Sequence, residues 1–221
     1  MNVHSLVVSA MLDTKQTRFV DRRPQILDAA ERCFSQAGFH HTTMQDVARE
    51  SGMVPGNLYR YFPSKDAIIA GLIERDRAAI AADFAELSDA ANLMSAFEQI
   101  GRKHLVEQPR EKAVLALQIW AEAARNPDIA ALCATIHQEV RNGIITVCQK
   151  SKRSGDIHPD VDVDALASLI LTLSDGLIRR RAIDRDFDSG REVDTVMCLI
   201  GALLNGTVAL SSCPSDPKTG I

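Results

Sequence analysis

The side chains with the most informative types and spacing lie in residues 43–62, which read TMQDVARESGMVPGNLYRYF. The end of this stretch presents, in one short helical pattern, Asn57, Tyr59, Arg60 and Tyr61. Amide, phenol and guanidinium groups donate hydrogen bonds to phosphates and to the edges of bases. Leu58 and Phe62, four residues apart, would form the buried side of the same helix. We therefore predict that this helix contacts DNA; a helical hairpin in an ordinary bundle is the alternative.

The preceding residues predict how this helix is held. Thr43 and Asp46 fit a capping box, in which two side chains satisfy free amides at the start of a first helix. Gly52 suits the left-handed conformation that commonly follows a helix, and Pro55 suits the first position of a second one. We expect that second helix to be about two turns long. Two short helices around a glycine turn are the layout of a DNA-binding helix-turn-helix.

Residues 22–76 closely resemble the DNA-binding domain of the TetR family of transcriptional regulators. The landmarks that carry the resemblance are Ile26-Leu27, Ala29-Ala30, Phe34, Gly38-Phe39, Thr42-Thr43, Val47-Ala48, Gly52, Tyr59-Arg60-Tyr61-Phe62 and Ser64-Lys65. The chain departs from the family at Val54, where Ser or Thr usually caps the recognition helix. We expect the missing cap to cost about 1 kcal/mol, partly offset by Pro55.

The resemblance also implies roles for single residues. The family contacts bases and backbone at the positions of Pro55, Gly56, Asn57, Tyr59 and Arg60, and it binds phosphates at those of Thr43, Tyr61 and Lys65. The chain has a net charge of −4, yet residues 1–80 carry 10 Lys and Arg against 9 Asp and Glu, so the acidic excess lies beyond residue 80. Phosphate affinity would therefore come from a few placed cations, among them Lys65, Arg60, Arg49 and Arg22-Arg23.

The pattern along the 221 residues predicts an all-α fold, with an N-terminal three-helix helix-turn-helix domain and a C-terminal helical domain for ligand binding and dimerisation. We expect a flexible arm over 1–19, the DNA-binding domain over 20–80 and the C-terminal domain over 81–221. Prolines, glycines and capping residues place further helices at 22–37, 64–87, 92–107, 110–125, 127–153, 162–183 and 189–210. No segment of strand period and no internal repeat is apparent.

Two late segments, 165–178 and 193–210, are apolar on nearly every side. A helix of this kind must be buried all round, and so small a chain would bury two of them by packing against a second copy. In the TetR family the last two helices form the dimer interface, which agrees with a homodimer through 162–183 and 189–210. We expect Leu171 and Leu203 at this interface; burial in an internal core is the alternative.

By resemblance, the middle helices hold a small-molecule effector. Candidates to line its pocket are Phe97, Ile100, His104, Trp120, Ile136, Val140 and Leu173, each of which could instead belong to the core. Because apolar residues dominate this set, we expect a hydrophobic or aromatic effector. Asp175, inside an apolar helix, needs a partner, and either pairs at the dimer interface or faces a polar cavity.

Other classes of function find little support. His137 and Glu139 are two residues apart and diverge on a helix, and no Cys/His cluster or GxSxG motif is present, so we expect no metal, no cofactor and no catalysis. The five cysteines lack CxxC spacing, which favours buried free thiols in the cytoplasm. Arg179-Arg180-Arg181 is interpreted as a solvated helix end. We expect no membrane span and no secretory signal; translation would start at Met1 or Met11.

Together these features predict a ligand-responsive repressor that binds double-stranded, palindromic operator DNA as a homodimer. The family's mechanism implies that an effector in the C-terminal domain tilts the long helix over 64–87 and lowers the affinity for the operator. Two alternatives stay open. One is a constitutive DNA-binding or architectural protein without an effector, and the other is a protein-interaction module that uses DNA binding for placement.

Overall fold

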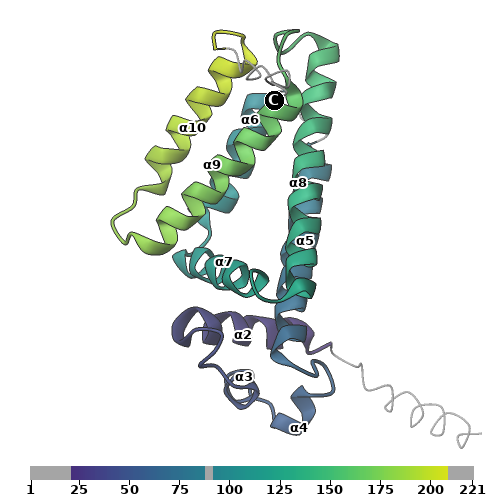
Figure 1. Ribbon diagram of the computed structural model, residues 1–221, viewed down its shortest axis with the longest axis vertical. Coiled ribbons are helices and arrows are strands. Elements are labelled where there is room, and N and C mark those ends of the chain that lie inside the picture. The colour runs from purple at the N-terminus through teal and green to yellow at the C-terminus, as the bar shows by residue number, and fades with distance from the viewer. Residues whose placement is uncertain (1–20, 88–91, 209–221) are drawn as a thin grey trace, which may run out of the picture.

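The computed structural model describes residues 21–87 and 92–208, so the expected arm over 1–19 lies outside the described residues. Within the described part every regular element is a helix, which confirms the all-α class (Figure 1). The elements are α2 (Arg23–Ala37), α3 (Met44–Glu50), α4 (Pro55–Leu58), α5 (Lys65–Leu87), α6 (Leu93–Arg102), the π-helix η2 (Lys103–Glu107), α7 (Arg110–Ala123), α8 (Pro127–Ser154), α9 (Val163–Ile183) and α10 (Ser189–Leu204).

Helices α2, α3 and α4 pack on the first half of α5 and form the N-terminal bundle at the lower end of the molecule (Figure 1). Their spacing of apolar residues places one stripe of each helix in a common core. Side chains buried there include Ile26, Ala30, Phe34, Val47, Ala48, Leu58, Ile68 and Leu72. This core holds α4 against the bundle by Leu58, while the rest of α4 faces outward.

The expected capping box and glycine turn are both present. The N–H of Asp46 donates to Thr43 Oγ1 (3.1 Å), and the N–H of Thr43 donates to Asp46 Oδ2 (2.9 Å). Hydrogen bonds from the side chain and backbone of Thr43 lower the pKa of Asp46 to about 2. Gly52 has φ 66°, the left-handed conformation that glycine adopts most readily.

The second helix of the motif is shorter than expected. Regular α-helix ends at Leu58, and turns continue the winding to Phe62, whose N–H donates to the carbonyl of Leu58 (3.0 Å). The prediction of two helical turns was therefore wrong for the regular helix, because the N–H groups of Arg60 and Tyr61 bond three residues back, to the carbonyls of Asn57 (3.2 Å) and Leu58 (2.9 Å), rather than four. As expected, Val54 provides no side-chain cap.

The C-terminal helices surround a second core. Helices α5 and α8 run side by side, α7 crosses above the N-terminal bundle, and α9 packs on α7, α8 and α10 (Figure 1). Buried side chains of this core include Leu93, Phe97, Ile144, Cys148, Leu166, Leu171, Ile200, Leu203 and Leu204. The expected domain boundary at residue 80 falls inside α5, so any division of the chain passes through this helix.

Helix α7 is tied directly to the end of α2. The amide of Gln118 donates to the carbonyl of Phe34 (2.9 Å), and its oxygen accepts the N–H of Phe39 (2.8 Å). One side chain thereby adds a second hydrogen bond to the carbonyl of Phe34, which also accepts the N–H of Gly38 (2.9 Å), and binds the N–H of Phe39 just beyond α2. The N-terminal bundle is therefore anchored to α7 as well as to α5.

Two arginines connect the ends of helices in a reciprocal way. Arg181 of α9 donates to the carbonyls of Leu105 (2.7 Å) and Val106 (2.9 Å), and also to that of Gln108. Arg110, at the start of α7, donates to the carbonyl of Arg181 (3.1 Å) and to the next carbonyl of α9. The interpretation of 179–181 as a solvated helix end was therefore wrong for Arg181, because carbonyls distant in the sequence accept hydrogen bonds from its guanidinium group.

The expected helix over 92–107 changes its winding at Lys103, where the π-helix η2 begins. This segment brings Lys103 and His104 onto Asp83, which is buried on α5. His104 Nε2 lies 2.6 Å from Asp83 Oδ2, and Lys103 makes a short contact with the other oxygen. Burial alone would raise the pKa of Asp83, but the hydrogen bonds from Lys103 and His104 outweigh it and lower this pKa.

Helices α5 and α8 approach most closely at Gly143. A Cβ atom added there would lie 2.8 Å from the ring of Phe84, well inside van der Waals contact. The absence of a side chain at Gly143 therefore sets the position of the Phe84 ring.

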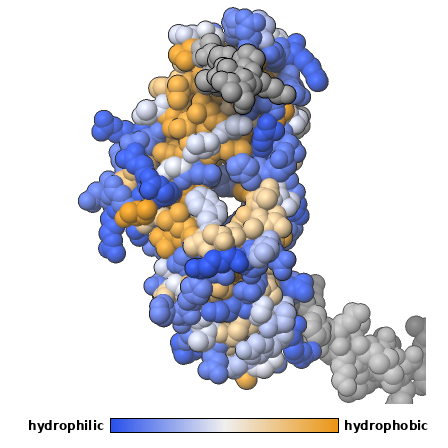
Figure 2. All heavy atoms as spheres, in the orientation of Figure 1, coloured by the Kyte–Doolittle hydropathy of each residue, from blue (hydrophilic) through white to orange (hydrophobic). Residues whose placement is uncertain are grey.

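The outer face of α9 and α10 carries exposed apolar groups, but they are not the expected ones. Leu171 and Leu203 are buried within the second core, because both point toward the neighbouring helices of the same chain. The exposed groups include Ile183 (64%) and Leu199 (39%), and Figure 2 shows apolar atoms over the upper half of the molecule. Cys198 is exposed too, so the expectation of buried thiols fails at this position.

The Asp83 cluster predicts a pH dependence of stability. Because the folded-state pKa of Asp83 lies below the ordinary 3.8, the unfolded chain binds more protons. The stabilisation is present above about pH 3.8 and is lost as the pH falls below it. Asp83→Asn should lower the free energy of unfolding by about 1–3 kcal/mol at pH 7, and this deficit should shrink toward pH 3. Urea unfolding at both pH values measures it, with the exposed Asp160→Asn as control. A deficit that is constant over this range would contradict the account.

Candidate DNA-binding surface and ligand cavity

The residues of α4 predicted to contact DNA lie together on one exposed surface. Val54 (69%) and Tyr59 (50%) are the most exposed large apolar or aromatic side chains there. Exposed with them are Pro55, Gly56, Asn57 and Arg60, whereas Tyr61 is half-buried. This distribution follows from Leu58, which holds one side of the short helix in the core and leaves the other open.

A groove of about 430 Å³ runs along this surface. Its lining residues are Arg22, Gly52, Met53, Val54, Asn57, Arg60 and Tyr61. The side chain of Arg60 makes no hydrogen bond or ion pair with any described residue, so its five N–H groups are available to a partner. Sequence reasoning gave Val54 only as a missing cap and did not include it among the contacts, although an exposed apolar group can touch a thymine methyl.

The predicted phosphate-binding residues are engaged to different degrees. Lys65 Nζ donates to the carbonyl of Phe39 (2.8 Å) and lies 4.5 Å from the centre of the Phe39 ring. Arg49 Nη2 is ion-paired with Asp46 (2.6 Å). The hydroxyl of Thr43 donates to the same carboxylate (2.6 Å). These groups therefore support the motif from within, besides any contact they make with DNA.

A large cavity of about 950 Å³ lies among α5 to α10. Figure 2 shows an opening at this place, in the triangle that α7, α8 and α9 outline in Figure 1. Of the expected pocket residues, those that line the cavity are Phe97, Ile100, His104, Trp120, Ile136, Val140 and Asp175. The structure brings together residues of the six helices α5 to α10 and of η2 around one mainly apolar space.

Leu173 is the one expected pocket residue that does not line this cavity. Helix α9 turns Leu171, Ser174, Asp175 and Ile178 toward the cavity. At about 100° per residue, position 173 falls well outside that face. Its side chain is only half-buried, on the side of α9 that carries Ile183.

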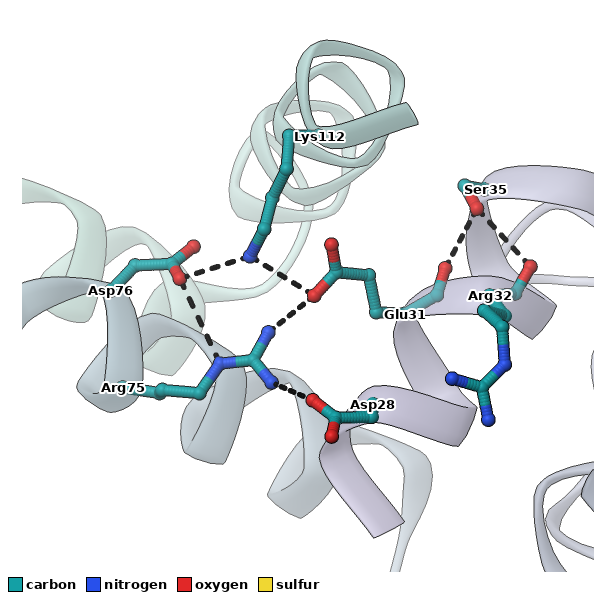
Figure 3. A network of polar contacts seen from close by, with 7 residues as sticks. All are labelled: Asp28, Glu31, Arg32, Ser35, Arg75, Asp76 and Lys112. Atoms are coloured by element: carbon teal, nitrogen blue, oxygen red, sulfur yellow. Dashed lines mark hydrogen bonds and ion pairs between the residues drawn. The ribbon is translucent and has the colours of Figure 1, made fainter. Parts of the chain in front are cut away.

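Sequence reasoning missed the charged floor of the cavity. Arg75 and Asp76 of α5 and Lys112 of α7 line it, and with Asp28 and Glu31 of α2 they form the junction network (Figure 3). Arg75 contacts Asp28 (2.9 Å) and Glu31, while Lys112 Nζ contacts Glu31 (3.0 Å) and Asp76 (3.2 Å). The network thus joins the N-terminal bundle to two walls of the cavity.

A signal for part of this floor was present in the sequence. Asp76, Ile80 and Phe84 are four residues apart, so they share one face of α5, and all three line the cavity. The contacts of Lys112 with Glu31 and Asp76 join residues far apart in the sequence, and no local pattern indicates them.

Asp175 borders the cavity, as in the second of the two alternatives for this residue, but the cavity is mainly apolar rather than polar. Its side chain makes no hydrogen bond or ion pair with any described residue. Partial burial raises the pKa of the Asp175 carboxyl, and the charge of His137 opposes this shift. Among residues 21–87 and 92–208, no three His, Cys, Asp or Glu side chains lie close enough to hold a metal ion. None of the described helices is long and apolar enough to cross a bilayer.

Comparisons with known proteins agree with this geometry. Residues 26–72 match the model of bacterial regulatory proteins of the tetR family, and residues 95–205 match that of the C-terminal region of BetI-type transcriptional repressors. The transcriptional regulator UidR of Escherichia coli K12 is 29% identical over 168 residues, which cover 76% of this chain and 85% of UidR. The transcriptional repressor Rv1474c of Mycobacterium tuberculosis is 26% identical over 168 residues, or 75% of this chain and 84% of that protein.

Solved structures show the same fold. Salmonella enterica GusR superposes with a TM-score of 0.71 at 27% identity, over 86% of this chain and 98% of GusR. The match to the C-terminal model alone extends over half of the chain, and the helix-turn-helix is matched in addition. The chain therefore belongs to the TetR family of bacterial transcriptional regulators, whose members bind operator DNA and form dimers.

Proposed function

We propose that this protein is a ligand-responsive transcriptional repressor that binds a palindromic operator as a homodimer in the cytoplasm, and that it acts by binding rather than by catalysis. One observation carries the proposal: the side chains that floor the cavity also hold the N-terminal bundle. The repressor sense is supported by the relative Rv1474c, which is itself named a repressor. A constitutive regulator would have no use for a cavity of about 950 Å³.

The cavity suits an apolar or aromatic ligand. Its walls include Phe84, Phe97, Ile136 and Val140, and Trp120 lies among them. A ligand that fills this space would press on α5 and α7, and the junction network would pass the displacement to α2. Ligand and operator would then weaken each other's binding by the same factor.

Two experiments test the proposal. Selection from a randomised DNA duplex pool should yield a palindrome, and that duplex placed before a reporter gene should repress the reporter when the protein is expressed. A thermal-shift screen should then find compounds that stabilise the wild type but not Ala116→Trp, which fills the cavity. A selected pool without a common site, or stabilising compounds that leave operator affinity unchanged, would overturn the proposal.

The α4 surface predicts a division of roles in DNA binding. Asn57→Ala or Arg60→Ala should reduce discrimination between the selected and a scrambled duplex by about 1–3 kcal/mol, because a bidentate base contact is lost. Tyr61→Phe and Lys65→Ala should instead weaken binding to both duplexes and reduce the salt dependence, because both residues are assigned to phosphates. Fluorescence anisotropy at two salt concentrations separates these cases.

Arg102→Ala is the matched control, because Arg102 lies on α6 and is ion-paired with Glu98. Lys65→Ala also needs a measurement of stability, since Lys65 is bonded to the carbonyl of Phe39. If Asn57, Arg60 and Lys65 could all be replaced by alanine without loss of binding, α4 would not be the recognition helix.

The exposed apolar face of α9 and α10 predicts the dimer interface. Leu199→Glu should shift the protein to a monomer without loss of fold, because Leu199 is exposed and outside the core. Leu203→Glu should unfold the chain instead, because Leu203 is buried. Val54→Glu, an equally drastic change at the exposed residue that precedes α4, should leave the dimer intact. Sedimentation velocity at micromolar concentration measures the mass, and a wild type of 24.2 kDa would refute the interface.

A further inference from the structure

The charged side chains that border the cavity differ in whether they already have a hydrogen-bond or ion-pair partner within the protein. Arg75, Asp76 and Lys112 are paired with one another and with acids of α2. Arg181 is held by three main-chain carbonyls. Among the acidic and basic side chains of the described lining, those of Asp175 and His137 make no hydrogen bond or ion pair to a described residue.

An anionic ligand would therefore find no free lysine or arginine side chain in the described lining, and the charge of the unpaired His137 there already acts on Asp175. To reach Arg75 or Lys112 it would have to displace Glu31 or Asp76, which already provide carboxylates to both. The junction network also holds three carboxylates against two cations, so its net charge repels an anion. Displacing a partner leaves a charge unpaired, and this cost cancels most of the gain.

Asp175 presents the opposite situation. Its carboxylate borders the cavity, is exposed and has no ion-pair partner among the described residues, so a ligand in the cavity can reach it. Two further polar side chains without a hydrogen bond to a described residue border the same space, His137 on α8 and Ser174 beside Asp175 on α9. A hydroxyl accepts hydrogen bonds as a carboxylate does, and an imidazole accepts one at a ring nitrogen that carries no proton. This wall of the cavity is therefore rich in acceptors.

The rest of the cavity lining suits a ligand that is mainly apolar and carries one positive charge. The rings of Phe84, Phe97 and Trp120 line the cavity, and aromatic faces attract cations. We propose that the cavity binds an apolar molecule with one protonated amino group, and that Asp175 takes this ammonium group, with His137 and Ser174 as further acceptors. The proposal deepens the proposed function, on which it rests for the role of the cavity as a ligand site.

Three probes that share one apolar body test it: 4-phenylbutylamine, 4-phenylbutanol and 4-phenylbutanoate. The chain has a single tryptophan, Trp120, and this residue lines the cavity, so its fluorescence reports binding directly on the protein without DNA. In the wild type the amine should bind at least about tenfold more tightly than the alcohol or the acid, because it alone forms a charge-assisted hydrogen bond.

In Asp175→Asn the amine should lose about tenfold in affinity and the alcohol should be unchanged, because the charge is removed and the shape is kept. Asp164→Asn is the matched control: it lies on the same helix, is paired with Arg141 (2.7 Å) and does not line the cavity. This control should keep the preference for the amine. Melting temperatures of both variants show whether they fold. The order of the three affinities in the wild type tests the preference for the amine without any variant.

Four other results would contradict the proposal. Tightest binding of the acid, equal binding of all three probes, no binding of any of them, or an amine preference that survives in Asp175→Asn would each overturn the assignment. Selection of a palindromic duplex uses no ligand, so these outcomes would leave the DNA-binding regulator standing. Conversely, an amine preference in a protein that selects no duplex would keep the ligand class and reject the regulator.

Discussion

Helix α5 belongs to two hydrophobic cores at once, and the rest of the molecule is arranged around this constraint. Ile68 and Leu72 are buried in the core of the N-terminal bundle, whereas Ile80 and Phe84 face the cavity. A continuous helix of 23 residues does not kink sharply between these points unless its ladder of backbone hydrogen bonds is interrupted. Displacement of its cavity end must therefore move its other end, and the N-terminal bundle packed there moves with it.

The junction network is weak in a way that suits a switch. Arg75, Glu31 and Lys112 are only partly buried, and solvent reduces each such pair to about 1 kcal/mol or less. The network thus sets the angle of α2 against α5 and α7 more than it adds to stability. A coupling between two sites typically amounts to about 1–3 kcal/mol, so a ligand beside Arg75 and Lys112 can rearrange a network of this strength without unfolding the core.

The sequence was sufficient for features that depend on neighbours along the chain. Proline, glycine and capping residues placed the helix ends, and the capping box of Thr43 predicted the helix-turn-helix. Residues such as Trp120 were assigned to the cavity by resemblance and helical position. The role of Arg181 and the burial of Leu203 were not predictable, because distant carbonyls and neighbouring helices determine them. An apolar helix face is the same in sequence whether a core or a second chain covers it.

The contact between Gly143 and Phe84 has a consequence for how such proteins diverge. Gly143 does not line the cavity, but any side chain at this position would push the Phe84 ring, which does line it, toward the open space. A substitution at Gly143 would then change the volume of the cavity, although every residue that lines the cavity stayed the same. Paralogues with alanine instead of glycine at this position would accept ligands of a different size. A comparison of the lining residues alone would not explain this difference.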